Sequence, residues 1–544
     1  MTPESYIRSE LNRYLESKAI SSIDFQFEIP RLKKFGDLST NIAMQISGRL
    51  GRSPRQVAEE IKEFIGLDST YLEKIDVAGP GFLNFFITES SVQSQLLEIL
   101  RQNGNFGRCD VGRGLHAQVE FVSANPTGPL TIGHGRQAVL GDTIARLLEF
   151  LGYQVTREYY YNDAGRQMRI LGDSVRMRYL QLLGEEISFP DDYYQGDYII
   201  DIAREILNED GESRRQESDL QYFIKKAETA VFLDIRQTIE RLGFRMDVYY
   251  NEKALYDEGK IEEVLNILRI KGLIEERDGA VWFLTSKIGM EQDRVVVKSS
   301  GEPTYRLPDI AYHCEKFRRG FDLIIDIFGA DHIATYPDVL LGVKAVGYDP
   351  EKVKVLIHQF VTLSEGSQKV RMSTRKANFV TLNELMDEVG VDVTRFFFLM
   401  RHMNSHLNFD LSLAKTQSDE NPVYYIQYAH ARICSILNFG LEKGIEPDDS
   451  ADLSLLNEQE SLDLIKHLLQ FPANVLSSGQ SFEPHRLVNY LTDTATYFHK
   501  FYTEHRVITD KHDLTQARLA LCQATRIILA TGCNLLGITA PQKM

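Results

Sequence analysis

The sequence predicts a multidomain α/β protein with a parallel-sheet core between an N-terminal α+β domain and a C-terminal α-helical bundle. Three observations predict this fold class. The chain has 544 residues, more than one hydrophobic core normally holds. Residues 118–161 read as strand, helix and strand. From Asn421 onward, apolar residues recur at helical spacing in several amphipathic segments. We expect domains at residues 1–105, 106–382 and 383–544.

The central segment begins as a strand–helix–strand unit. Residues 118–123 alternate and are rich in β-forming residues, and residues 153–161 form the second strand. Between them a loop of turn formers leads into a helix that starts near Gly135 and stops at Gly152. The free amides and the dipole at such a helix start favour a phosphate. An ordinary βαβ unit with an idle loop is the alternative, since the loop matches neither GxGxxG nor GxxxxGK[ST].

The end of this loop carries a family resemblance. Thr131-Ile132-Gly133-His134 resembles the HIGH motif of class I aminoacyl-tRNA synthetases, and Glu120–Gly135, EFVSANPTGPLTIGHG, resembles the version of bacterial arginyl-tRNA synthetases. The resemblance implies a class I nucleotide-binding core in which Gly133 lets adenine approach the backbone and His134 supports the phosphates of ATP. Thr131 stands where the family usually has His. Its hydroxyl donates a hydrogen bond but carries no charge, so we expect an effect on rate rather than on reaction class.

The bulk composition is typical of a globular protein in a reducing compartment. Hydrophobic residues make up 43% of the chain, no run of 18 apolar residues marks a membrane span, and the polar N-terminus lacks a signal-peptide core. Five scattered cysteines without a CxxC pair argue against zinc and disulfides, so we expect no zinc, no membrane and a cytoplasmic location. The net charge of −16 sits mostly in the middle of the chain, which permits an RNA partner at the more neutral ends.

Residues 1–105 contain two words, FGDLSTNIA and GPGFLNF, that resemble the N-terminal additional domain of arginyl-tRNA synthetases. The resemblance implies contact with the tRNA elbow around the D-loop. Lys33 and Lys34 are the candidate tRNA contacts, with Arg49 and Arg52 as further basic residues of the same domain. For each of these side chains, a solvated charged surface is an equally good interpretation.

An arginine substrate needs anionic partners, because guanidinium is planar and permanently charged. Glu120, at the end of the first strand, and Asp309, in GEPTYRLPDIAYH, match the acidic positions that hold the guanidinium in the family. By the same resemblance Tyr305 assists them and Asn125 holds the α-groups of the amino acid. Taken singly, Glu120 reads as a surface strand carboxylate and Asp309 as a helix N-cap. Together, in matching context, they predict an arginine pocket.

The expected ATP site combines the loop with the end of a second strand. Residues 323–336, LIIDIFGADHIATY, read as a buried strand followed by polar residues, and ligands lie at the carboxyl ends of parallel strands. A cap packed on the core is the alternative for Asp331 and His332. The resemblance assigns ATP binding to Ala124, Asn125, Pro126, Thr127, Gly128, Gly133, His134, Gly329, Asp331, His332 and Met372.

The basic segment 369–382, KVRMSTRKANFVTL, resembles the KMSK loop that closes over the phosphates of ATP in class I synthetases. Arg371-Met372-Ser373-Thr374 occupies the motif, with Arg371 in place of the usual Lys. Ala377 stands where Gly is usual, and its smaller backbone freedom predicts stiffer closure. Taken alone, the segment reads as a solvated basic loop. With the first motif, the predicted catalytic residues are Thr131, Gly133, His134, Arg371, Ser373, Arg375 and Lys376.

Two further regions follow the family's domain order. Residues within about 166–300 resemble its insertion between the two halves of the nucleotide fold, and we assign no chemistry to them. Residues 392–395 resemble the DALR word of the C-terminal domain, which the family uses to recognise the anticodon. Aromatic side chains stack on splayed bases, although such stripes also form bundle cores. The candidate tRNA contacts there are Tyr424, Tyr425, Tyr428 and Arg432.

The resemblance spans nearly the whole chain. It implies an arginine–tRNA ligase that joins L-arginine to ATP and passes the arginyl group to the terminal ribose of tRNA-Arg. Mg²⁺ accompanies ATP, the protein itself binds no metal, and we expect a monomer. Two alternatives stay open. A class I synthetase for another amino acid would leave Glu120 and Asp309 buried without partners. A catalytically weak RNA-binding paralogue is the other, motivated by Thr131 and Arg371.

Overall fold

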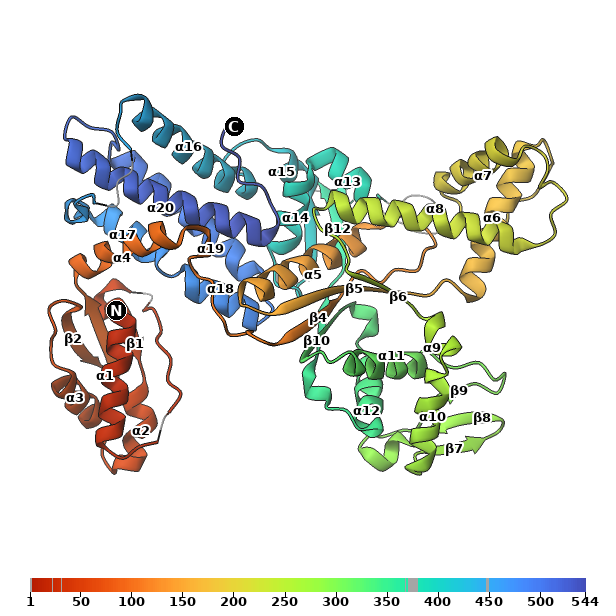
Figure 1. The fold of residues 1–544 in the computed structure, drawn as a ribbon, viewed down its shortest axis with the longest axis horizontal. Coiled ribbons are helices and arrows are strands. Elements are labelled where there is room, and N and C mark those ends of the chain that lie inside the picture. Colours follow the sequence, from red (N-terminus) through yellow and green to blue (C-terminus); the bar gives the residue numbers. More distant parts are fainter. Residues whose placement is uncertain (1, 22, 31, 367, 370–379, 447–449) are drawn as a thin grey trace.

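The computed structural model describes residues 2–21, 23–30, 32–366, 368–369, 380–446 and 450–544. These residues form an elongated molecule with a parallel sheet near its centre (Figure 1). The N-terminal domain and the C-terminal helices lie at one end of the long axis, and two inserted units lie at the other. The predicted fold class is confirmed.

The N-terminal domain is an α+β unit with its own hydrophobic core, formed by buried residues between Ile7 and Phe85. Helices α1 (Pro3–Ser17), α2 (Ile42–Leu50) and α3 (Pro54–Ile65) accompany an antiparallel sheet of β1 (Leu38–Thr40), β3 (Phe82–Ile87) and β2 (Leu72–Ala78), in that order. The next helix, α4 (Glu89–Gln102), packs instead on α17 (Gln459–Leu468) and α20 (His512–Leu536). The domain core therefore closes near residue 88 rather than at 105, because α4 buries its apolar face against the C-terminal helices.

The central sheet has five parallel strands in the order β11-β10-β4-β5-β6. Their bounds are β4 (His116–Glu120), β5 (Gln154–Tyr161), β6 (Val248–Asn251), β10 (Leu323–Gly329) and β11 (Val353–His358). The chain winds outward from β4 to β6 and then returns to the other side of β4 with β10. The carboxyl ends of β4 and β10 thus flank the point where the winding reverses, which is where ligands bind in open α/β sheets.

Helices cover both faces of this sheet. Helix α5 (Ile132–Phe150) joins β4 to β5, which confirms the predicted strand–helix–strand unit. It starts three residues earlier than expected, because Thr131 is its N-cap. Helix α11 (Arg306–Arg318) lies on the opposite face, where Phe317 packs with Ile324 of β10, and α12 (Tyr336–Val346) packs beside it.

Two units are inserted between β5 and β10. The first is a helical arm of α6 (Gly165–Leu182), α7 (Asp197–Asp210) and α8 (Leu220–Arg241). The second contains α9 (Lys253–Asp257), α10 (Lys260–Ile270) and an antiparallel sheet of β7 (Ile274–Arg277), β8 (Ala280–Phe283) and β9 (Arg294–Val297). The expected single insertion is therefore interrupted, because β6 returns to the core sheet between the two units.

The remaining chain completes the core and builds the bundle. A second sheet contains β12 (Val361–Glu365), β13 (Gln368–Lys369) and β14 (Leu407–Asp410), with α13 (Leu382–Val389), α14 (Val391–Leu399) and α15 (Leu411–Lys415) around it. The bundle adds α16 (Pro422–Glu442), α18 (Phe471–Gln480) and α19 (His485–Glu504) to α17 and α20. Short 3-10 turns lie at Lys33–Phe35, Asn103–Asn105, Thr285–Ile288, Ala330–His332, Pro350–Lys352 and Leu453–Leu455.

Helix α20 is the one helix of the described chain that is long and apolar enough to cross a membrane by length and composition. In its most apolar window, 72% of the residues are buried inside the structure. Its apolar character is therefore that of a central helix packed against α16, α19 and α4.

The DALR-like word forms a junction between domains. The fully buried guanidinium of Arg395 on α14 donates to Asp142 Oδ2 on α5 at 2.6 Å. It also donates to the carbonyl oxygens of Leu242, at the end of α8, at 2.8 Å and Leu536, at the end of α20, at 3.0 Å. Carbonyls at helix ends lack intrahelical donors, so one side chain satisfies two helix ends and a buried carboxylate.

Candidate active site

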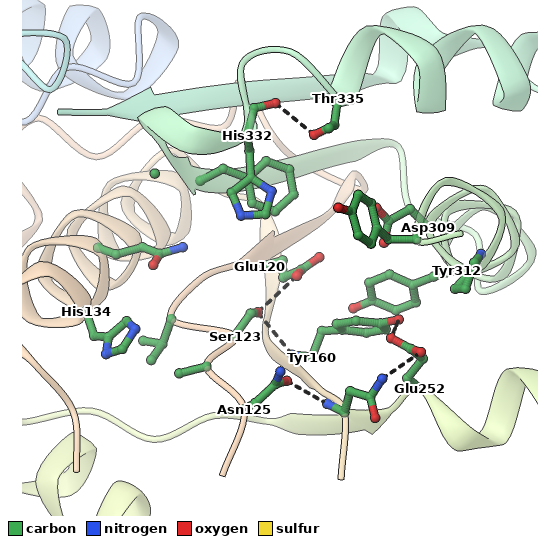
Figure 2. Close-up of a pocket in the computed structure, with 18 of the residues that line it drawn as sticks. Glu120, Ser123, Asn125, His134, Tyr160, Glu252, Asp309, Tyr312, His332 and Thr335 are labelled. Atoms are coloured by element: carbon green, nitrogen blue, oxygen red, sulfur yellow. Dashed lines mark hydrogen bonds between the residues drawn. The ribbon is translucent and has the colours of Figure 1, made fainter. Parts of the chain in front are cut away.

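A cavity of about 1440 Å³ opens at the carboxyl ends of β4 and β10 (Figure 2). Its walls come from the loop after β4, the start of α5, the start of α11, the end of β10 and the segment after β6. His134 and Asp309 lie on opposite sides of it. Pockets for one small molecule typically measure roughly 300–1,000 Å³, so this cavity has room for two substrates side by side.

The start of α5 presents a neutral imidazole to the cavity. The backbone N–H of Thr131 donates to His134 Nδ1 at 3.2 Å, and Thr131 Oγ1 lies 3.3 Å from the same nitrogen. Because Nδ1 accepts a hydrogen bond, the ring hydrogen resides on Nε2. Burial lowers the pKa of His134 to about 4, so the ring is uncharged at pH 7. His134 therefore acts as a hydrogen-bond donor rather than as a cation.

Parts of the predicted ATP loop also border this cavity. A Cβ at Gly133 would meet only Thr131 Oγ1, at 3.8 Å, so this residue faces open space. Asn125 accepts from the backbone N–H of Asn162 at 3.0 Å and donates to Gln167 at 3.1 Å. Ala124 lines the cavity as well, and its carbonyl oxygen accepts a hydrogen bond from the Tyr159 hydroxyl of β5 at 2.7 Å.

Three predicted ATP contacts lie on the other side of the same loop. Pro126, Thr127 and Gly128 are not part of the described cavity lining. The carbonyl oxygen of Thr127 accepts from the Tyr198 hydroxyl of α7 at 2.7 Å, and a Cβ at Gly128 would lie 2.9 Å from that hydroxyl. These residues anchor the loop to the helical arm.

The turn after β4 holds strained backbone beside the cavity. Val122 and Ser123 have φ angles of +69° and +42°, which are rare for residues other than glycine and most unfavourable for a β-branched side chain. Such residues cost about 1–3 kcal/mol each and cluster at functional sites. Ser123 donates to Glu120 Oε1 at 2.9 Å and accepts from the backbone N–H of Tyr160 at 3.1 Å. The turn thereby fixes the orientation of the Glu120 carboxylate.

Glu120 already has a cation inside the protein. The fully buried ammonium of Lys316 lies 2.6 Å from Glu120 Oε2 and 2.5 Å from Asp326 Oδ1. Burial raises the pKa of Glu120, and the charge of Lys316 opposes that rise. Burial would lower the pKa of Lys316, but the carboxylates outweigh it and raise that pKa. The expectation that Glu120 is unpaired without a cationic substrate is therefore wrong.

Asp309 lines the cavity without a cationic partner within the described chain. It lies in the first turn of α11, whose N-cap is Tyr305, so the N-cap interpretation of Asp309 is wrong. Its carboxyl has no hydrogen bond or ion pair within the described chain, and it lines the cavity together with Glu120. Burial raises the pKa of Asp309 to about 7, and the charges of Glu120 and Glu252 add to the rise. Tyr305 lies at the rim with 69% of its surface exposed.

Sequence reasoning missed Glu252 and the tyrosines beside it. Glu252 lines the cavity directly after β6, accepts from the Tyr160 hydroxyl at 2.7 Å and accepts from Asn162 Nδ2 at 2.8 Å. Burial raises its pKa. Tyr312 of α11 also lines the cavity. β6 has four residues, too few to show strand periodicity in the sequence. The sequence therefore places Glu252 in the predicted insertion, and its position directly after a core strand is visible only in the structure.

The end of β10 contributes Gly329 and His332 to the cavity, and the His332 ring stacks on Phe328 with centroids 5.0 Å apart. The side chain of Asp331 lies outside the described set. The predicted basic-loop residues Arg371, Met372, Ser373, Arg375 and Lys376 lie outside the described residues as well.

The described residues on both sides of the basic segment reach the cavity. Val361, in the strand before it, and Val380, after it, line the cavity. Thr381 pairs with Thr131 in a β-bridge, and the backbone N–H of Leu382 donates to Leu130 at 2.8 Å. The described residues that follow the basic segment are therefore anchored at the first motif.

The candidate tRNA residues fall into two groups. Lys33 forms an ion pair of 2.6 Å with Asp463 of α17, joining the N-terminal domain to the bundle, and the Lys34 ammonium lies 5.0 Å from the Phe35 ring centroid. On α16 the rings of Tyr424 and Tyr428 stack with centroids 6.2 Å apart, and Arg432 lies over Tyr428 at 5.1 Å. Tyr425 contacts His499 of α19 at 4.8 Å. These half-buried rings form one aromatic face between α16 and α19.

Comparison with known proteins classifies this architecture. The catalytic-domain model of class I (R) tRNA synthetases matches residues 95–401, the arginyl-tRNA synthetase N-terminal domain matches 4–87, and the DALR anticodon-binding domain matches 426–544. The chain therefore contains the catalytic domain of a class I aminoacyl-tRNA synthetase.

Full-length relatives define the family. An arginine–tRNA ligase of Desulfotalea psychrophila is 52% identical over 99% of this chain and 100% of its own, and one of Salinibacter ruber is 48% identical over the same shares. The Thermus thermophilus arginyl-tRNA synthetase structure, 23% identical, superposes over 100% of both chains with a TM-score of 0.78, which shows the shared fold. The chain belongs to the arginyl-tRNA synthetase family, and its activity is that of an arginine–tRNA ligase.

Proposed function

We propose that the cavity binds L-arginine with its guanidinium between Asp309 and Glu252 and its α-groups near Asn125. One observation carries this proposal: Asp309 and Glu252 line the cavity and have no cationic partner within the described chain, whereas Glu120 has Lys316. A guanidinium supplies one delocalised charge and five donors in a plane, which suits two carboxyls that line one cavity. Glu120 would then orient the pocket through Ser123 and Lys316 rather than form the main ion pair.

We propose that ATP lies at the start of α5, beside the arginine carboxylate. The free amides of the first turn and the Nε2–H of His134 meet phosphate oxygens there, and Gly133 leaves room for adenine. An oxygen of the arginine carboxylate attacks the α-phosphorus, and the bond from that phosphorus to the leaving pyrophosphate breaks. The protein contributes positioning and charge stabilisation, for which a neutral donor and a helix start are sufficient tools. Mg²⁺ accompanies the phosphates of ATP.

In the second step the arginyl group passes to the 2′-hydroxyl of the terminal ribose of tRNA-Arg. The aromatic face of α16, with Tyr424, Tyr428 and Arg432, is the proposed anticodon contact, because stacked rings and a guanidinium suit splayed bases. Lys34 is the better D-loop candidate of the two lysines, since Lys33 already pairs with Asp463. All five cysteines are free, which supports a cytoplasmic location. We propose that the enzyme acts as a monomer, which light scattering of the purified chain tests directly.

Aminoacylation of total tRNA with each of the twenty labelled amino acids tests the substrate. Arginine alone should be transferred. Transfer of another amino acid at a similar rate would refute the arginine pocket. ATP–pyrophosphate exchange with arginine, with and without tRNA, separates catalysis from binding: tRNA binding without exchange would favour the RNA-binding paralogue.

A further inference from the structure

The face of α11 toward the sheet carries a row of cations that matches a row of buried carboxylates. Asp326, Glu120 and Glu158 are register neighbours on β10, β4 and β5, and all three are buried. Like charges directly opposite each other on neighbouring strands repel, so the row requires counter-charges. Helix α11 and its C-cap supply them at intervals of three residues. His313 lies 2.8 Å from Asp326, Lys316 bridges Asp326 and Glu120, and Arg319 donates to both oxygens of Glu158 at 2.6 and 2.7 Å.

The contacts of His313 define its protonation. Nδ1 lies 2.7 Å from the backbone carbonyl oxygen of Asp309, and Nε2 lies 2.8 Å from Asp326 Oδ2. A carbonyl oxygen only accepts. The Asp326 carboxylate also only accepts, because its other oxygen takes the Lys316 hydrogen bond and the charges of Lys316 and His313 outweigh burial to lower its pKa. Both ring nitrogens must therefore donate, so His313 is an imidazolium.

The charges of this row then balance. Glu120 and Asp326 are matched by Lys316 and His313, and Glu158 is matched by Arg319. Asp309 lies one helical turn before His313, past the end of the row, with its carboxyl in the cavity. His313 is thus the last cation of the row, and its ring donates a hydrogen bond to the backbone carbonyl oxygen of Asp309.

We propose that His313 is a positioning residue of the arginine pocket: as an imidazolium clamped between Asp326 on β10 and the Asp309 carbonyl on α11, it sets both the place and the charge state of the Asp309 carboxyl that meets the guanidinium. This inference rests on the proposed arginine pocket. His313 also borders the cavity, but in this scheme it makes no direct contact with the substrate. It acts through Asp309. Together with Lys316 it neutralises Glu120 and Asp326, so that these two carboxylates do not compete with Asp309 for the guanidinium.

The proposal makes arginine binding depend on pH in a defined way. Arginine needs the ionised form of Asp309, and the charge of His313 lowers the pKa of that carboxyl against the effect of burial. Removing the positive charge while keeping a hydrogen bond should move Asp309 ionisation to higher pH. The charged and titratable groups around Asp309 and His313 are Glu120 on β4, Tyr160 on β5, Glu252 after β6, Tyr256 on α9, Tyr312 and Lys316 on α11 and Asp326 on β10.

Two neutral variants separate charge from hydrogen bonding. His313→Gln keeps a donor toward Asp326, and His313→Asn keeps a donor toward the Asp309 carbonyl. The arginine KM, the ATP KM and kcat are measured in tRNA aminoacylation from pH 6.5 to 9. His467→Gln is the matched control, since His467 is also a buried helix histidine with a hydrogen-bonded Nε2 but is held neutral, burial having lowered its pKa to about 4.

In the His313 variants, the arginine KM should rise about eightfold at pH 6.5 and about threefold at pH 7.5 and return to within about twofold of wild type at pH 9, because a lost neighbouring charge raises the pKa of the Asp309 carboxyl by about one unit. The ATP KM should stay constant, and the control should match wild type throughout. A KM ratio that is constant across pH, or an equal rise in the ATP KM, would show a purely structural role and overturn the proposal.

Two further measurements keep the outcome unambiguous. Asp309→Asn should raise the arginine KM at every pH; if its KM equals that of wild type, the proposed pocket itself fails, whatever His313 does. If both His313 variants fail to fold, nitrogen-15 shifts of the wild-type histidine rings decide. At pH 7.5, at least one of the 13 histidines should retain the shifts of a doubly protonated ring. Thirteen neutral rings would refute the proposal.

Discussion

Thr131→Ala tests how a threonine serves in place of the family's first motif histidine. The change removes Oγ1, which lies 3.3 Å from His134 Nδ1, and leaves the backbone N–H contact of 3.2 Å in place. A neutral hydrogen bond contributes about 0.5–1.5 kcal/mol, and an N-cap about 1 kcal/mol. Both contacts are near the long end of hydrogen-bond lengths, and α5 is largely buried, so the helix itself stays folded. The expected loss is about 1 kcal/mol in the orientation of His134, or about fivefold in kcat.

The assay is aminoacylation kcat at saturating arginine, ATP and tRNA, with His134→Ala measured in parallel. Removing an entire preorganised donor costs about a hundredfold or more in kcat. Thr131→Ala should therefore lie between wild type and His134→Ala, with unchanged arginine KM. A loss as large as that of His134→Ala would mean that Thr131 itself contacts the reacting groups. No loss at all would mean that the hydroxyl does not orient the imidazole.

The remaining predictions concern both binding and stability. Burial raises the pKa of Asp309 to about 7, so the carboxylate is present above that pH and protonated below it; the arginine KM of wild type should rise about tenfold per pH unit below 7, and a flat profile would contradict the assignment. Asp309→Ala should raise the arginine KM about a hundredfold at pH 8, since truncating one partner of a desolvated charge pair costs about 2–5 kcal/mol, and an unchanged KM would remove Asp309 from the pocket. His134→Ala should leave tRNA affinity, measured by filter binding, within about twofold of wild type while kcat falls at least a hundredfold, because a neutral hydrogen-bond donor to the phosphates stabilises the transition state of the reaction. Equal losses of tRNA affinity and kcat would count against a role of His134 in ATP binding. Thr131→His should keep or raise kcat, because the side chain at this position borders the cavity; abolished turnover would indicate a rebuilt site. Arg395→Met should lower the free energy of unfolding by about 2–6 kcal/mol in thermal unfolding, because the carbonyl oxygens of Leu242 and Leu536 lose their donor at about 1–3 kcal/mol each while Asp142 keeps its ion pairs with Arg146 and Arg157; a loss below about 1 kcal/mol would contradict this.

Local patterns predicted the parts of the site that are local in sequence. The strand, loop and helix around Thr131 and His134 follow from alternation, turn formers and helical spacing within about forty residues, and the structure has them. The pairing of Glu120 with Asp309 in one cavity came from family resemblance, and both do line it. No periodicity connects two residues so distant in the chain.

What sequence reasoning missed depends on strand register. Lys316 and Glu120 are 196 positions apart, and their contact arises because β10 pairs with β4 so that Asp326 lies beside Glu120. A lysine on an amphipathic helix normally faces water, so its burial is visible only when the sheet is assembled. The apolar face of α4 is likewise visible in the sequence. The domain against which this face packs becomes clear only in the assembled structure.

The buried guanidinium of Arg395 has a practical consequence for genetics. It lines neither the cavity nor the aromatic face of α16, yet it closes the ends of two helices and holds the helix that begins at the first motif. A screen of random substitutions would find that Arg395 tolerates few replacements. The defect would be ascribed to catalysis if aminoacylation were assayed and to tRNA recognition if tRNA binding were assayed. A lowered melting temperature that accompanies both defects would reveal that a shared structural contact, rather than either binding surface, had been removed.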